Sequence, residues 1–299
     1  MSGPVIEIDA LTKNFGSVTA VDDLSFRVEP GVVTGFLGPN GAGKTTTLRT
    51  LLGLVRPTSG TATFDGRRYA QLEQPLTMVG TALEASSFHP GRTGRDHLRT
   101  AALAAGIRLS RVDEVLEWVG LGASGRRRVG GYSLGMRQRL GLAFALLGDP
   151  GALVLDEPIN GLDPEGIRWI REFLRQLAGE GRTVLVSSHL LSEVQQTVDR
   201  VIIISRGRLV HTGTLAGLEA ASRVHVDGPD RAALTRALAP AQIESRDDGL
   251  HVSGVTAAEV GALAYAAGAA LSLLAPEREG LENVFLELVG DSDAEVVAR

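Results

Sequence analysis

The sequence predicts an α/β fold built on a parallel sheet and followed by a smaller α+β domain. Between residues 32 and 204, short apolar runs alternate with helical patterns, which is typical of parallel strands buried on both faces. A glycine-rich loop joins one of these runs to a helix. After about residue 220 the pattern changes to short elements in the order β-α-β-β-α-β, so we expect a second domain.

The composition is that of an ordinary globular protein. The 299 residues include 43% hydrophobic and 22% charged residues, which suffices for one large domain or two modest ones. The net charge of −5 gives no basic excess for binding phosphate backbones, so no nucleic-acid partner is expected. There is no cysteine, which excludes disulfides and thiolate metal sites and suits a reducing compartment.

No targeting or membrane-spanning segment is expected. The first residues include acidic side chains and lack the basic start and apolar core of a secretory signal. The longest uncharged run, residues 260–276, is rich in Ala and Gly and is shorter than the about 20 apolar residues of a membrane helix. We therefore expect a cytoplasmic chain that reaches a membrane only through a partner.

The N-terminal part has the pattern of short strands joined by turns. Residues 5–28 alternate apolar and polar positions in short runs, and Pro30-Gly31 ends this region. Residues 32–37 form a continuous apolar strand. The helix expected after the glycine-rich loop, residues 45–54, stops before Pro57 because proline cannot continue a helix.

Helices and strands alternate through the rest of the first domain. From about residue 95 to residue 127, apolar positions recur at helical spacing on one face. The remaining expected elements are strands at 153–155, 183–186 and 201–204, and helices at 167–177 and from 190 onward.

The tail predicts a compact second domain. Its expected elements are strands at 223–226, 242–246, 250–253 and 270–274, helices at 231–238 and 257–267, and a turn at residues 247–249. This order matches the split β-α-β of a ferredoxin-like domain, which a last amphipathic helix at 281–289 would close. The predicted domains are therefore residues 1–220 and 221–299.

The glycine-rich loop fits the phosphate-loop pattern. It lies between a buried strand and a helix N-terminus, where glycines let backbone N–H groups point at phosphate oxygens with the helix dipole behind them. Lys44 would reach the β and γ phosphates, and Thr45 would bind Mg²⁺. The predicted nucleotide-binding residues are Gly38, Pro39, Asn40, Gly41, Ala42, Gly43, Lys44, Thr45 and Thr46.

A second segment, residues 131–158, narrows the prediction from nucleotide binding in general to one mechanism. It begins with a Ser-Gly turn and a helix and ends with an apolar strand that carries Asp156 and Glu157. The first carboxylate is placed to hold Mg²⁺ beside Thr45, directly or through water. Glu157 follows the metal ligand by one residue and could act as the base that polarises the attacking water.

Together these motifs resemble the ATP-binding subunits of ABC transporters, most closely the drug- and bacitracin-resistance exporter ATPases that work with a separate permease. The resemblance covers roughly residues 1–220. It implies a P-loop ABC ATPase fold with a RecA-like core, an antiparallel β subdomain and a helical subdomain at about 84–150. ATP and Mg²⁺ are the implied cofactors, and the α+β tail at 221–299 is an accessory domain of unassigned role.

The resemblance also assigns roles to residues outside the phosphate loop. Phe15 resembles the aromatic that stacks on adenine, although a plain core aromatic is the alternative. Ser133 and Gly135 belong to the signature that meets the γ-phosphate bound by the other subunit, at the positive end of the helix expected at 137–147. Asp163 resembles the loop that communicates across the dimer, and His189 the switch histidine that contacts the γ-phosphate.

Glu84 is the first departure from the family pattern. The family carries a glutamine here that links Mg²⁺ and the attacking water to the permease contact. Glu84 supplies the same oxygen geometry and adds a negative charge, so it is predicted to be both a catalytic residue and a metal ligand. The alternative is a solvated loop glutamate.

The signature is the second departure. It has Tyr132, Leu134 and Met136 where the usual form has Leu, Gly and Gln, but it keeps Ser133 and Gly135. Residues 126–128, three arginines, are expected to form a solvated face. The remaining histidines show no ligand spacing and are assigned no role; they are His89, His97, His211, His225 and His251.

Other functional classes fit less well. Residues 131–135 also match the G-x-S-x-G nucleophile elbow of a serine hydrolase, with Asp156 and His189 in triad order. The elbow must follow a buried strand, however, and Gly125 to Gly130 cannot form one. A soluble, non-transport ABC ATPase usually carries two cassettes or a long coiled coil, and neither is visible. A small GTPase would need an Asn-Lys-x-Asp motif, which does not occur.

We therefore expect a cytoplasmic ATPase that forms a homodimer on binding ATP and powers export through an integral membrane permease. Lys44, Thr45 and Asp156 of one subunit would enclose Mg-ATP with Ser133 and Gly135 of the other. The chain would lie on the inner face of the cell membrane, held there by the permease.

Overall fold

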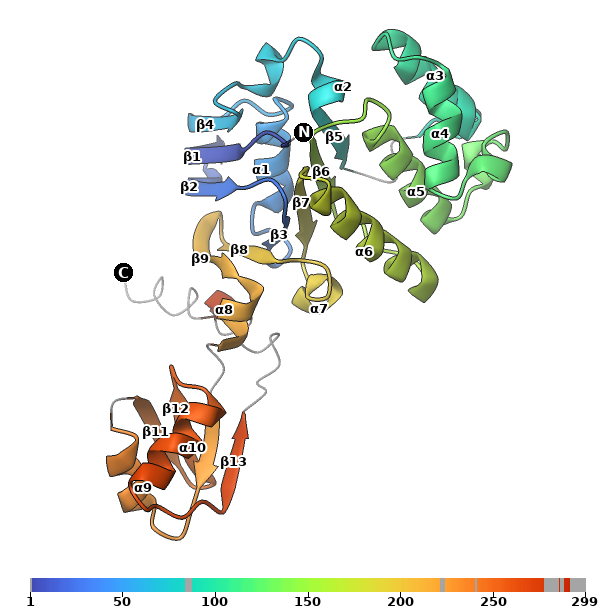
Figure 1. Ribbon diagram of the computed structural model, residues 1–299. Helices are drawn as coiled ribbons and strands as arrows, with labels where there is room; N and C mark the ends of the chain where they lie inside the picture. Colours follow the sequence, from blue (N-terminus) through green and yellow to red (C-terminus); the bar gives the residue numbers. More distant parts are fainter. Residues whose placement is uncertain are drawn as a thin grey trace. The chain divides into compact units, whose positions relative to one another are not determined.

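The computed structural model describes residues 2–83, 88–220, 224–239 and 241–276, together with 285 and 288–290. The chain divides into two compact units, residues 1–212 and 213–299 (Figure 1). Each unit is described by itself below. The division falls a few residues before the predicted domain limit, and the limits 1–220 and 221–299 stay a prediction.

A six-stranded sheet forms the centre of the first unit, with the strand order β5-β6-β7-β3-β8-β9. The pairs β5–β6, β6–β7, β7–β3 and β3–β8 are parallel. All residues of β3 and β7 are buried, which confirms that the continuous apolar runs are strands covered on both faces. The strands are β3 (Val33–Leu37), β5 (Val79–Ala82), β6 (Ala152–Asp156), β7 (Thr183–Ser188), β8 (Arg200–Ser205) and β9 (Arg208–Thr214).

An antiparallel sheet with the order β2-β1-β4 lies beside it, built from β1 (Ile6–Phe15), β2 (Val18–Val28) and β4 (Ser59–Phe64). The short runs expected before residue 28 are in fact two long strands with register shifts along their pairing. The two sheets share one core, in which the Phe26 and Phe36 rings lie 5.2 Å apart. Helix α1 (Lys44–Leu51) contacts β2, β4 and β6 and so joins the two sheets.

Three helices form a separate bundle at one side of the central sheet: α3 (Gly94–Ala104), α4 (Ser110–Trp118) and α5 (Leu134–Ala145) (Figure 1). They contact one another, and α5 also contacts β5. Leu98, Leu116 and Leu140, one from each helix, are buried in the bundle. The predicted helical pattern is therefore a bundle, interrupted by 3₁₀ turns at Gly122–Ser124 and Val129–Gly131.

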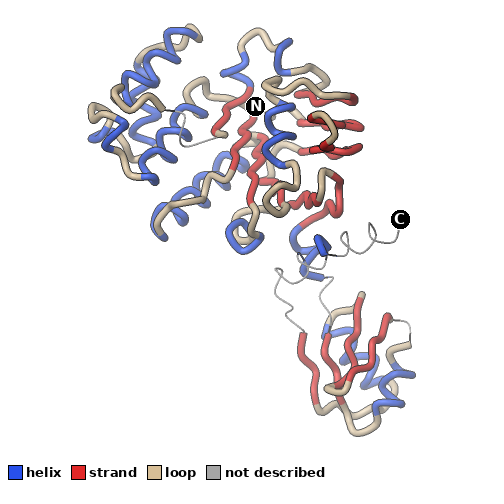
Figure 2. The backbone as a smooth tube through the Cα atoms, turned by 180° about the vertical axis from the view of Figure 1, so that it is seen from behind, coloured by secondary structure: helices blue, strands red, loops and turns tan. Residues whose placement is uncertain are grey.

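The other helices of this unit are short or lie against the sheet (Figure 2). Helix α6 (Pro164–Gly179) contacts β3 and β7, and α7 (Leu191–Val194) contacts β7. Helix α2 (Pro75–Met78) precedes β5, and a 3₁₀ turn spans Tyr69–Gln71.

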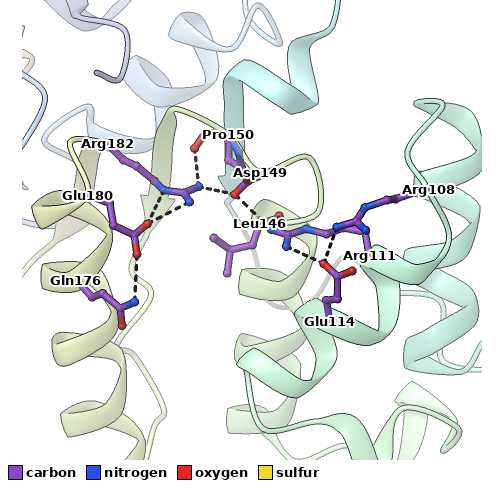
Figure 3. Close-up of polar contacts among 9 residues, drawn as sticks. All are labelled: Arg108, Arg111, Glu114, Leu146, Asp149, Pro150, Gln176, Glu180 and Arg182. Carbon is purple, nitrogen blue, oxygen red and sulfur yellow. Dashed lines mark hydrogen bonds and ion pairs between the residues drawn. The ribbon is translucent and has the colours of Figure 1, made fainter. Parts of the chain in front are cut away.

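A chain of charged side chains connects the helical bundle to the central sheet (Figure 3). Asp149, in the loop between α5 and β6, pairs with Arg111 of α4 at 3.3 Å and with Arg182, just before β7, at 2.9 Å. Arg111 is largely buried, and it also pairs with Glu114 and donates a hydrogen bond to the carbonyl oxygen of Leu146. This network links the bundle to the sheet through an exposed carboxylate.

The second unit contains a four-stranded antiparallel sheet with the order β11-β12-β10-β13. Leu234 of α9 and Val260 of α10 pack with Val226 and Val252 of the sheet in one apolar cluster. Along the chain the elements are α8 (Leu215–Ala220), β10 (Val224–Asp227), α9 (Arg231–Ala237), β11 (Gln242–Arg246), β12 (Gly249–Ser253), α10 (Ala257–Ala266) and β13 (Leu273–Pro276).

In this order β12 separates β10 from β11, as in a split β-α-β unit, and we retain the ferredoxin-like assignment as a prediction. The predicted helix at 281–289 lies mostly outside the described residues. Among the described residues, no helix is both long and apolar enough to span a membrane.

Candidate functional site

The glycine-rich loop leaves the end of β3 and enters α1, where the sequence predicted it. Gly43 is the N-cap of α1 and has φ 103°, a value that side chains other than glycine rarely adopt. A Cβ atom on Gly38 would collide with the carbonyl oxygen of Ile204 in β8, and one on Gly43 with that of Ala20 in β2. Neighbouring backbone therefore requires glycine at both positions, apart from any role in binding.

Lys44 is the first residue of α1 and its side chain is buried. Its Nζ donates hydrogen bonds to the carbonyl oxygens of Gly38 (2.6 Å) and Pro39 (3.2 Å), so the ammonium lies inside the loop. Nζ is also 4.0 Å from Oε1 of Glu157. Burial lowers the pKa of Lys44, and the negative charges of Glu157 and Asp156 oppose this shift.

Thr45 and Asp156 meet next to this lysine. The Thr45 hydroxyl donates to Oδ2 of Asp156 at 2.9 Å, although the two residues lie far apart in the sequence. A hydroxyl and a carboxylate are oxygen donors of the kind that Mg²⁺ prefers. These two side chains therefore fit a magnesium ion, which would take the place of the hydrogen bond between them.

Ser187 contacts the Asp156 carboxylate and the Glu157 backbone, and it was missed as a site residue. Its hydroxyl donates to Oδ1 of Asp156 and accepts a hydrogen bond from the backbone N–H of Glu157 at 3.0 Å. Ser187 is fully buried in β7, where it is the register partner of Asp156 in β6. Serines are common at strand ends, so only the register of the sheet reveals this contact.

Glu157 and His189 form the outer part of the site. His189 Nδ1 lies 2.8 Å from Oε2 of Glu157, and both side chains are about a quarter exposed. Glu157 has φ 51°, a left-handed conformation that is uncommon without glycine and is concentrated at functional sites. Lys44, Asp156, Glu157 and His189 are thus brought together at the carboxyl ends of β3, β6 and β7, where ligands bind in open α/β sheets.

The second group of predicted residues lies at the start of α5, and Figure 1 places α1 and α5 on opposite sides of β6 and β7. The Ser133 hydroxyl caps α5 by accepting from the N–H of Met136. Leu134, 53% exposed, lies over Gly161, where its Cδ2 occupies the space that a Cβ would take. Asp163 caps α6 by accepting from the N–H of Gly166 at 2.9 Å.

Two of the three departures from the signature pattern, Tyr132 and Leu134, have different structural settings. Tyr132 is buried, its hydroxyl donates to the carbonyl oxygen of Ser124 at 2.8 Å, and burial raises its pKa. Gly94 allows this packing, since a Cβ there would lie 2.5 Å from the Tyr132 hydroxyl. Leu134 instead remains at the surface, so this departure changes the exposed end of α5.

The remaining expectations have separate outcomes. Phe15, at the end of β1, is 51% exposed, which excludes the core-aromatic alternative, and Nζ of Lys13 lies 4.7 Å from its ring centroid. Residues 126–128 are exposed, as expected. Glu84 lies outside the described residues. The segment before Ser133 is a 3₁₀ turn rather than a strand, so no hydrolase elbow is present there.

Comparisons with known proteins identify the family of the first unit. The profile of the ABC transporter family matches residues 21–160, and a domain of unknown function matches residues 222–282. The chain is 46% identical to a bacitracin transport ATP-binding protein of Bacillus licheniformis over 69% of this chain and 68% of that protein. It is 37% identical to a lantibiotic transport ATP-binding protein of Streptococcus pyogenes over 69% and 89%.

Solved structures show the same fold. An ATP-binding subunit of an ABC transporter superposes with a TM-score of 0.65 at 27% identity, covering 72% of this chain and 92% of that one. The predicted fold class is thereby confirmed for the first unit. From these matches and the site's geometry, the chain belongs to the ABC transporter family, in which it is an ATP-binding subunit that hydrolyses ATP.

Proposed function

We propose that two copies of this chain enclose Mg-ATP and that hydrolysis drives export of a peptide antibiotic through a separate membrane permease. The observation that carries the catalytic part is the contact set around Asp156 and Glu157, which joins Thr45, Ser187 and His189 in one site. The named activities of the bacitracin and lantibiotic relatives support the choice of cargo class.

The phosphate loop would bind the nucleotide. Lys44 would exchange its hydrogen bonds with Gly38 and Pro39 for the β and γ phosphates, whose charge favours the protonated amine. Thr45 and Asp156 would hold Mg²⁺, which supplies charge neutralisation on the phosphates. Pro39, Asn40, Gly41, Ala42 and Thr46 complete the proposed loop contacts, and Phe15 offers its exposed ring to adenine.

Glu157 is the proposed general base. Its backbone is anchored by Ser187, and its carboxylate by the contact with His189. This arrangement lets Glu157 accept a proton from water attacking the γ-phosphate, a contribution of about 10²- to 10⁴-fold in rate. His189 would orient the base and contact the γ-phosphate. Glu84 is proposed as a further contact to Mg²⁺ and to the attacking water.

The site is proposed to be completed by a second copy. Ser133 and Gly135 lie at the N-terminus of α5, where the helix dipole and free N–H groups favour an anion. Because α5 and the phosphate loop lie on opposite sides of β6 and β7, we infer that this end serves the partner's nucleotide. Asp163 would couple the two nucleotide sites across the dimer. Closure on ATP and opening after hydrolysis would then move the permease.

Glu157→Gln tests the catalytic proposal. The variant should bind ATP, accumulate as a dimer and lose turnover, whereas Glu165→Gln, an exposed glutamate at the start of α6, should hydrolyse ATP at the parental rate. Turnover by Glu157→Gln at the parental rate would remove Glu157 as the base.

Co-purification tests the transport part. The full chain should be recovered on the inner face of the cell membrane with an integral membrane partner. Recovery with ribosomes alone would favour a non-transport ABC ATPase instead.

A further inference from the structure

Two histidines face each other across the sheet of the second unit. His225 in β10 and His251 in β12 are register partners, so their side chains leave the sheet side by side. Their rings are stacked, with centroids 4.8 Å apart and an interplanar angle of 10°. Their spacing along the chain does not predict this pairing, because the two histidines lie on different strands.

The pair lies outside the apolar core of this unit. Val224, Val226, Leu250 and Val252 alternate with the two histidines and point into the cluster beneath α9 and α10. The histidines therefore belong to the opposite face of the sheet. Even so, His251 is only 1% exposed, which is unusual for a titratable side chain that is not part of the core.

Asp248, in the turn between β11 and β12, brings a third donor to this pair. Its Oδ1 lies 3.0 Å from Nε2 of His251, and its backbone carbonyl oxygen lies 3.0 Å from Nε2 of His225. Gly249 makes room for this arrangement, since a Cβ there would lie 2.6 Å from Nε2 of His225. Both imidazoles thus point the same ring nitrogen toward one aspartate.

We propose that His225, Asp248 and His251 form a binding site for a divalent transition-metal ion of the zinc type. Their ligand atoms all lie within 4.8 Å of one another. A tetrahedral ion with bonds of about 2.0–2.2 Å needs its ligand atoms about 3.4 Å apart. The most widely spaced ligand atoms must therefore approach one another by up to about 1.4 Å. Rotation of the side chains can bring them together, and the Asp248 side chain, 62% exposed, has room to rotate.

The donor set selects the type of ion. Imidazole nitrogens suit Zn²⁺, Co²⁺, Ni²⁺ and Cu²⁺, whereas Mg²⁺ and Ca²⁺ prefer sites made of oxygen alone. Asp248 supplies a carboxylate, which is an oxygen ligand that Zn²⁺ accepts beside imidazole nitrogens. Glu244, the register partner of His251 in β11, adds a second carboxylate nearby and is paired with Arg246. The exposed side of Asp248 leaves the fourth position to water or an exogenous ligand.

An ion at this site would tie β10 to the turn between β11 and β12. Metal binding would then add to the folding free energy of the second unit, because the ligands come together only in the folded sheet. This inference does not depend on the proposed function, since none of the three residues belongs to the nucleotide site.

Titration of the untagged full chain with Co²⁺, in excess Mg²⁺ to occupy the nucleotide site, tests the proposal. The parental chain should bind one Co²⁺ with the intense visible absorption of tetrahedral coordination, and Zn²⁺ should displace it. Asp248→Asn should weaken binding at least about tenfold, as should His225→Gln, since even outer-shell changes weaken metal sites by about 10- to 100-fold. Asp247→Asn, one residue away in the same turn, is the matched control and should bind as the parental chain does.

Circular dichroism of each metal-free variant checks that it is folded. The proposal is overturned if the parental chain shows no tetrahedral Co²⁺ spectrum, or if Asp248→Asn and Asp247→Asn bind Co²⁺ equally well. Asp248→Asn keeps the test valid even if a histidine variant unfolds, because Asp248 is an exposed turn residue.

Discussion

Replacing Ser187 with alanine should impair both the stability and the catalysis of the ATPase unit. The fully buried hydroxyl is the shared partner of Asp156 and of the Glu157 backbone. Removing the hydroxyl takes one hydrogen-bond donor from the Asp156 carboxylate and the acceptor from the backbone N–H of Glu157. The two residues affected are those proposed to hold Mg²⁺ and to activate water.

The size of the effect follows from these two bonds. A hydrogen bond to a charged group contributes about 1.5–3 kcal/mol, and an unsatisfied buried N–H costs about 1–3 kcal/mol. Because one hydroxyl serves both partners, the two terms overlap, and we expect a loss of about 2–4 kcal/mol in the free energy of unfolding. Glu157 already holds an unfavourable backbone conformation at φ 51°, so losing its anchor should also displace the base.

Urea unfolding followed by tryptophan fluorescence measures this loss. Both tryptophans, Trp118 and Trp169, belong to the first unit, so the signal reports that unit alone. Ser188→Ala is the matched control: Ser188 is the adjacent buried serine, and its hydroxyl bonds to the backbone of Leu190. The control should lose some stability but keep its rate of ATP hydrolysis once folded.

The reasoning is refuted if Ser187→Ala hydrolyses ATP at the parental rate with an unchanged urea midpoint. Equal catalytic losses in Ser187→Ala and Ser188→Ala would also contradict it, since the Ser187 hydroxyl contacts the Asp156 carboxylate and the Glu157 backbone, whereas the Ser188 hydroxyl bonds to the Leu190 backbone.

Three further predictions concern the rest of the chain. Tyr132→Phe removes the hydrogen bond to the Ser124 carbonyl oxygen, so the free energy of unfolding, measured in urea, should fall by about 1–2 kcal/mol. An unchanged free energy of unfolding would mean that this bond does not stabilise the fold. Asp149→Asn breaks the pairs with Arg111 and Arg182, but the carboxylate is exposed, so we expect less than about 1 kcal/mol and a smaller effect in high salt. A loss of stability in Asp149→Asn that does not depend on salt would contradict the view that these ion pairs are exposed and weak. Hydrogen bonds from Arg231 and from the Thr256 backbone lower the pKa values of Asp227 and Glu259 below their ordinary 3.8 and 4.5. Their stabilisation is therefore complete above these values and lost as pH falls through the folded-state pKa values. The urea resistance of the second unit, followed by NMR of its strand amides, should fall below about pH 4.5, and less steeply in Asp227→Asn.

The parts of the fold that the sequence predicts well are those with strong patterns. Strands β3, β6 and β7 are continuous apolar runs because both of their faces are covered, and each was expected. Strands β4 and β5 were not expected, since Ser59–Phe64 and Val79–Ala82 are rich in Gly, Thr and Ala and show little hydrophobic pattern. Their positions depend on pairing with β1 and β6, which is tertiary information.

The same distinction applies to the sites. Spacing along the chain indicated the phosphate loop and the Asp156-Glu157 pair, because each lies on one local strand and turn. Ser187 and the His225–His251 pair depend instead on the register between strands. A one-residue shift in register would turn each side chain to the other face, so the sequence alone cannot place them.

The central claim is that two copies complete the nucleotide site, and sedimentation velocity of Glu157→Gln with and without ATP tests it most directly. The claim predicts a monomer without nucleotide, a dimer with Mg-ATP, and no dimer when Gly135→Asp is added, because the new carboxylate would repel the partner's γ-phosphate. A chain that remains monomeric with bound ATP, or a dimer that forms equally with Gly135→Asp, would contradict it.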